Sequence, residues 1–170
     1  MKGTVKKLVV TAMLTAIAVS LSAFSIPIGA SKCFPIQHLV NVVTGIFLGP
    51  WYGVLMAFCT SFIRNLMGTG SLLAFPGSMV GAFLCGILYQ RYHKLVLAYI
   101  GEVIGTGIIG AMLCYPVATL IMGQEAALFA YVIPFMMSTV VGTIFAAVLT
   151  ETLYKTHAME YMKQLLEANG

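Results

Sequence analysis

Acidic side chains are scarce in this chain, which contains no aspartate and only five glutamates. Charged residues of both signs make up 8% of the sequence, whereas a soluble domain carries about 25%. Hydrophobic residues make up 60%. The composition therefore excludes a soluble module and predicts one membrane-embedded domain over residues 1–170.

The sequence also lacks the motifs of a catalytic or metal-binding site. Its four cysteines stand singly, without a CxxC pair or a Cys/His cluster, so neither a zinc site nor a disulfide framework is indicated. The segment Gly68-Thr69-Gly70-Ser71 lacks the lysine of a phosphate-binding loop, and neither Gly-x-Ser-x-Gly nor His-Glu-x-x-His occurs. We expect no enzyme activity, no metal and no cofactor.

Basic residues gather at the N-terminus, at Arg91–Lys94 and after Tyr154, as the positive-inside rule places them in cytoplasmic segments. The net charge of +4 is therefore no sign of nucleic-acid binding. Because each of these basic clusters is expected on the cytoplasmic side, an even number of spans must lie between one cluster and the next. We predict an all-α bundle of six transmembrane helices with both termini cytoplasmic, although two spans instead of four in the first half stay possible. The expected helices cover about 7–27, 36–49, 51–67, 73–90, 94–122 and 128–154, followed by a short tail at 155–170.

Two ionisable residues interrupt the apolar runs of this chain. Arg64 lies in the third expected helix and Glu102 in the fifth. A charge at the centre of a bilayer costs at least about 2.5–3.5 kcal/mol, so such residues face a bundle interior or a wet cavity. A functional site is the favoured interpretation, and a structural charge that pairs or snorkels is the alternative.

Other polar side chains gather in the outer halves of the expected helices, where they predict a small-molecule pocket that opens outward. We also expect Phe75 or Tyr131 near that pocket, whereas Trp51 lies at the inner turn and fits an interfacial position better. The nine predicted substrate-binding residues are Gln37, His38, Asn41, Arg64, Asn65, Phe75, Ser78, Glu102 and Tyr115.

Small residues mark the expected helix contacts, because lipid gives no hydrophobic drive for helix association and close backbone approach matters more. Gly77-x-x-x-Gly81 and Gly101-x-x-x-Gly105 are expected to pack inside the bundle. Ala12 and Ala16 lie on one face near the cytoplasmic end of the first helix. Internal packing and contact with an external protein partner are both open for this pair.

The blocks QHLVN, LGPWY, SFIRN, FPGSM and GEVIGTG, which run from Gln37 to Gly107, resemble the ThiW family. The resemblance implies the substrate-binding S component of an energy-coupling factor (ECF) vitamin transporter in a bacterial or archaeal plasma membrane. It implies as partners one transmembrane coupling protein and two cytoplasmic ATPase subunits, with Ala12 and Ala16 docking on the coupling protein. The implied substrate is hydroxyethylthiazole, the thiazole precursor of thiamin.

Two other functional classes are alternatives to this interpretation. A stand-alone carrier would use Glu102 as a proton site and would need no ATPase. An intramembrane enzyme would need a nucleophile–base pair or a metal cluster, and the sequence offers neither.

Overall fold

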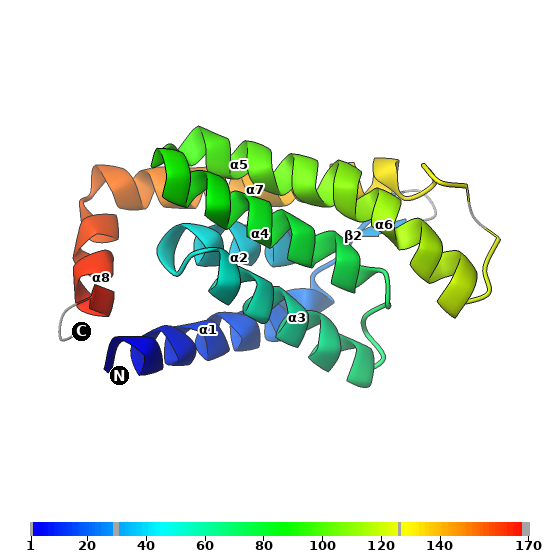
Figure 1. Ribbon diagram of the computed structural model, residues 1–170, viewed down its shortest axis with the longest axis horizontal. Coiled ribbons are helices and arrows are strands. Elements are labelled where there is room, and N and C mark those ends of the chain that lie inside the picture. The colour runs from blue at the N-terminus through cyan, green and yellow to red at the C-terminus, as the bar shows by residue number, and fades with distance from the viewer. Residues whose placement is uncertain (1, 29–30, 126, 168–170) are drawn as a thin grey trace.

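The computed structural model of the chain describes residues 2–28, 31–125 and 127–167, and it is a helical bundle (Figure 1). The expected helical class is confirmed, with one short two-stranded ribbon as an addition. The elements in chain order are α1 (Lys2–Ser20), η1 (Leu21–Ala23), β1 (Ile26–Ile28), β2 (Ser31–Cys33), α2 (Pro35–Phe47), α3 (Pro50–Leu66), α4 (Ala74–Tyr92), α5 (Leu95–Ile104), η2 (Gly105–Gly110), α6 (Ala111–Pro116), η3 (Val117–Ile121), α7 (Val132–Lys155) and α8 (Ala158–Glu167).

The first helix is shorter than expected. It ends at Ser20, and one 3₁₀ turn carries the chain to Ala23 rather than to residue 27. Proline disfavours a helical conformation in the residue before it, and Pro27 lies in the strand β1. The strands β1 and β2 then pair antiparallel, with Ile26 opposite Cys33, and lead into α2.

The segment from α5 to η3 is one continuous helix over Leu95–Ile121. It contains two wide π-helical stretches, η2 and η3. Pro116 directly precedes η3 and has no N–H for the normal helical hydrogen bond, which accounts for the second irregularity. Such π turns often accompany functional sites, and η2 begins three residues after Glu102.

Glycines bring α4 into direct backbone contact with this long helix. A Cβ atom on Gly105 would lie 2.7 Å from the Cα of Gly81, and one on Gly110 would lie 2.7 Å from the Cα of Gly77. Neither separation leaves room for a side chain. The expected internal packing of these glycines is confirmed, and α4 packs against α2, α3, α5 and η2.

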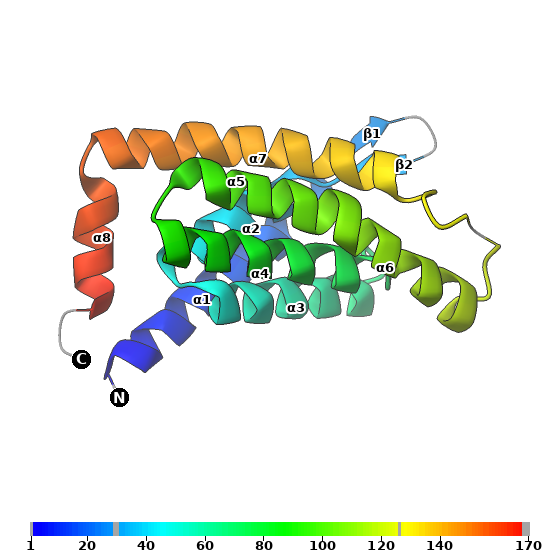
Figure 2. The same ribbon diagram turned by 45° about the horizontal axis from the view of Figure 1, so that its top comes forward.

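The start of α1 and the last helix, α8, lie at the same end of the bundle, opposite the β-ribbon and the loop that follows η3 (Figures 1 and 2). The expected tail folds in part into α8, which turns away from α7 across this end, while residues 168–170 lie outside the described residues. Met159 of α8 is buried in the core, and Lys6 Nζ donates a hydrogen bond of 2.9 Å to the carbonyl of Leu165.

Within residues 2–28, 31–125 and 127–167, three helices are by themselves long and apolar enough to cross a membrane: Gly3–Ala23, Leu95–Ile121 and Val132–Lys155. The chain is therefore a multi-pass membrane protein. The helix α2 has 13 residues, about 20 Å at 1.5 Å per residue, against about 30 Å for the hydrocarbon layer. Six spans and the cytoplasmic side of the termini remain predictions.

Candidate substrate site

A cavity of about 640 Å³ opens at the end of the bundle remote from α8. Its walls come from the segment after α1, the start of α2, the loop between α3 and α4, and the start of α7. The volume lies in the range of about 300–1,000 Å³ that holds small ligands. The aromatic, charged and polar side chains of its lining include Phe34, Gln37, His38, Arg64, Ser78, Tyr131, Phe135 and Ser138.

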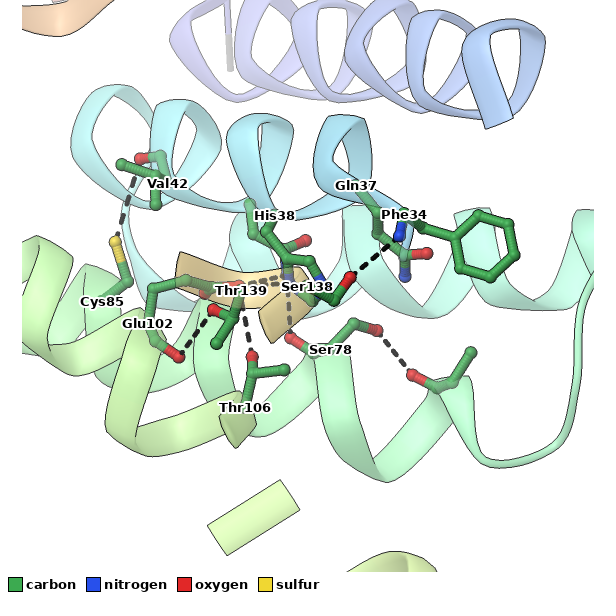
Figure 3. A network of polar contacts seen from close by, with 12 residues as sticks. Phe34, Gln37, His38, Val42, Ser78, Cys85, Glu102, Thr106, Ser138 and Thr139 are labelled. Carbon is green, nitrogen blue, oxygen red and sulfur yellow. Dashed lines mark hydrogen bonds and ion pairs between the residues drawn. The ribbon is translucent and has the colours of Figure 1, made fainter. Parts of the chain in front are cut away.

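A buried carboxylate lies behind the floor of this cavity. Glu102 has no exposed surface, and its Oε1 accepts hydrogen bonds from Asn41 Nδ2 at 3.0 Å and Thr106 Oγ1 at 3.2 Å. The Nδ1 atom of His38 lies 2.9 Å from the same oxygen. Figure 3 shows the side chains of His38, Glu102 and Thr106 converging from α2, α5 and η2. Because an ionised carboxylate only accepts hydrogen bonds, Nδ1 carries a proton in that state, and a neutral imidazole then has Nε2 left as an acceptor.

Arg64 forms part of the cavity wall and is only 2% exposed. One Nη donates to Oε1 of Gln37, and the other donates to the carbonyl of Thr69 at 3.2 Å. The guanidinium carbon lies 4.2 Å from the centre of the Phe34 ring. Arg64 therefore links α3 to the start of α2 and to the loop before α4.

Serine hydroxyls continue this polar network from Arg64 toward the floor. Ser78 donates to the carbonyl of Ala74 at 2.7 Å, so the 3.3 Å bond between Ser61 and Ser78 has Ser61 as its donor. Gln37 Nε2 donates weakly to Ser61 at 3.5 Å, and Asn41 Nδ2 lies 3.3 Å from the carbonyl of Ser78. Three helices thus share one polar layer in an otherwise apolar bundle.

A family model for thiamine-precursor transporter proteins, ThiW, matches residues 8–156 of the chain. The chain belongs to the ThiW family. No protein in a curated collection matched it. The family makes the protein a thiamine-precursor transporter, with a small-molecule substrate and a place in a membrane, and it argues against an enzyme.

In this ThiW-family chain, both intramembrane charges face the bundle interior, as the sequence predicted. No ion pair joins Arg64 to Glu102 among the described residues. Four predicted site residues line the cavity: Gln37, His38, Arg64 and Ser78. Asn41 and Glu102 lie one layer deeper and meet the cavity through His38. Contact of any of them with a ligand remains a prediction.

The remaining three predicted site residues lie neither in the cavity lining nor in the layer behind it. Asn65 follows Arg64 by about 100° around the helix, and its Nδ2 donates to the carbonyls of Ser61 and Ser71. Phe75 packs against Phe58 of α3, with ring centroids 5.5 Å apart. Tyr115 lies beside the buried Cys114 but is 37% exposed on the outer side of α6. Their positions in sequence indicated the correct end of the bundle but not the direction of the side chains.

Sequence reasoning missed several residues of the cavity and of the polar network behind it. Thr106 lies four residues after Glu102, a spacing that puts both on one helix face and that predicts the observed bond. Phe135 and Ser138 come from α7, in a stretch without charged residues, and carried no signal of their own. Within the described part of the chain, no group of three His, Cys, Asp or Glu side chains is placed to hold a metal.

Proposed function

We propose that this ThiW-family protein is the S component of an ECF transporter and captures hydroxyethylthiazole at the outer face of a bacterial or archaeal plasma membrane. The observation that carries the proposal is the cavity itself. It opens at the end opposite the termini and combines a histidine at its floor, an arginine in its wall and aromatic side chains around them.

The chemistry of these residues suits a small heterocyclic alcohol. His38 is held by Glu102 through Nδ1, so in the neutral imidazole Nε2 is the atom left to accept a hydrogen bond from the hydroxyl of a ligand. Phe34, Tyr131 and Phe135 give the ring an apolar slot, and a few placed polar groups then fix its orientation. Such a site binds its ligand and performs no reaction on it.

The exposed face of α1 favours contact with a protein partner in the membrane. Thr11, Thr15 and Ala18 are buried against the bundle, whereas Ala12 and Ala16 are exposed on the other side. Small residues allow another helix to approach closely. We assign this face to the transmembrane coupling protein, which joins the S component to two cytoplasmic ATPases.

A proton-coupled carrier is the second candidate, and the buried pair of His38 and Glu102 favours it. The two side chains lie 2.9 Å apart between the cavity and the middle of the bundle. In such a carrier this pair would exchange a proton during transport, and the protein would work without an ATPase.

Titration of the purified chain in detergent with hydroxyethylthiazole tests the substrate assignment. Isothermal calorimetry should show saturable binding at one site per chain, with the pyrimidine half of thiamin as the comparison ligand. Binding of the pyrimidine alone would contradict the assignment, as would no binding of the thiazole at about millimolar concentration, which corresponds to only about −4 kcal/mol.

A further inference from the structure

The positive charge of Arg64 has no counter-charge among the described residues. Its two hydrogen-bond acceptors, Gln37 and the Thr69 carbonyl, are neutral. The ion pairs among the described residues each join a histidine to a glutamate, and neither includes Arg64. Since an arginine side chain remains protonated in proteins, the cavity wall carries an uncompensated positive charge.

Glu102 does not supply the missing negative charge. Its Oε1 is shared by His38, Asn41 and Thr106. Its Oε2 lies close to Gly81, where an added Cβ would come within 2.8 Å of it. The described residues that line the cavity include no acidic side chain, and Glu102 is not one of them.

Arg64 still has hydrogen-bond donors available. A guanidinium carries five N–H groups in a planar fork, and Gln37 and Thr69 account for two of them. Nε is buried and has no hydrogen-bond partner among the described residues. Burying an unpaired charge is strongly unfavourable, and the guanidinium fork matches the oxygens of a phosphate or carboxylate.

We infer that the ligand carries an anionic group, and that the cavity takes a phosphate monoester of a small heterocyclic alcohol, with Arg64 as its counter-ion. The inference rests on the S-component role in the proposed function, and it replaces the free alcohol as the substrate by the phosphorylated form. The heterocycle would occupy the aromatic part of the cavity beside Phe135, and the phosphate would face Arg64.

The direct test compares two ligands on the wild-type protein by calorimetry at one ionic strength: hydroxyethylthiazole and its phosphate monoester. Hydrogen bonds to charged groups are the stronger ones, so the ester should bind at least about tenfold more tightly. Inorganic phosphate should compete with the ester. Equal or tighter binding of the alcohol would overturn the inference and leave the proposed function standing, and failure of both compounds to bind would overturn both.

A Gln37→Glu substitution provides an internal counter-ion for Arg64. It keeps the oxygen that accepts from Arg64 and adds a negative charge, and the Ser61 hydroxyl can turn to donate to the second oxygen. The preference for the ester over the alcohol should fall by about tenfold or more. Gln164→Glu, in α8, adds the same charge far from the cavity and should leave the preference unchanged. A folded Gln37→Glu protein that keeps the full preference would contradict the inference, and the wild-type comparison decides the question by itself if this variant does not fold.

Discussion

Glu102 holds the side chain of His38 in place through a hydrogen bond. It has no exposed surface, and His38 lies between it and the cavity. A ligand that bonds to His38 therefore depends on Glu102 for the orientation and tautomer of the imidazole. Asn41 and Thr106 fix the carboxylate in turn.

A Glu102→Gln substitution keeps the size of the side chain and removes its charge. Hydroxyethylthiazole should bind less tightly by about 1–3 kcal/mol, because a buried hydrogen-bond network then has donors that compete for one neutral oxygen. Calorimetric titration measures this difference. Glu151→Gln, on the exposed side of α7, is the matched control and should bind as the wild type does. Identical affinities for both variants would place the ligand away from His38.

The burial of Arg64 and Glu102 was predictable from sequence, because an isolated charge in lipid is too unfavourable to leave exposed. The directions of Asn65, Phe75 and Tyr115 were not. These residues lie at helix ends or beside an irregular turn, where a rotation of one residue changes the face by about 100°. The neighbouring helices decide that rotation, and no local pattern records it.

Two elements meet closely where α4 crosses the long helix that begins with α5. A Cβ atom on Gly81 would collide with Thr106 and lie 2.8 Å from Oε2 of Glu102. The spacing of the glycines allowed this contact to be predicted. The π-helical stretch η2 could not be predicted, because it depends on the fit between two particular helices.

A Gly81→Ala substitution should therefore destabilise the fold by about 1–3 kcal/mol through overpacking. It should also weaken ligand binding, because the collision displaces Glu102. Thermal unfolding in detergent measures the first effect. Gly3→Ala is the control, since its Cβ would meet only the Leu166 carbonyl at 3.7 Å. An unchanged melting temperature for Gly81→Ala would contradict the close approach.

The exposed side of α1 is the proposed contact surface for the coupling protein. Ala12→Leu or Ala16→Leu should abolish co-purification with the ECF coupling protein, because a bulky side chain prevents close helix approach. Ligand binding by the isolated chain should persist, since both alanines lie away from the cavity. Met13→Leu is the control, as Met13 is already large and 60% exposed. Recovery of intact complex from the alanine variants would move the interface elsewhere.

The whole molecule has its cavity at one end, and α8 and the start of α1 at the other (Figure 1). The positive-inside rule predicts that the end with α8 is cytoplasmic. In a background without the native cysteines, a Glu125→Cys variant should react with a membrane-impermeant thiol reagent on intact cells. A Gln164→Cys variant should react only after permeabilisation. The reverse labelling would invert the proposed topology and point the cavity inward.

The helical class and membrane location of the molecule were predictable from composition, because few charges and long apolar runs leave no other option. The helix α8 was expected only as a tail, since ten residues with one apolar side give a weak signal. The cavity was predictable in its location but not in its walls, which depend on how the segment after α1 and the start of α7 fold over the end of the bundle.

Uptake into proteoliposomes tests most directly whether the chain is an S component. The assay distinguishes a subunit of an ATP-driven complex from a carrier that works alone. Labelled hydroxyethylthiazole, and its phosphate ester in parallel, should accumulate only when the chain is reconstituted with the coupling protein, both ATPases and ATP. The chain alone should bind the ligand without accumulating it, with or without a proton gradient. Accumulation by the chain alone, driven by a proton gradient, would contradict the S-component account and establish the carrier in its place.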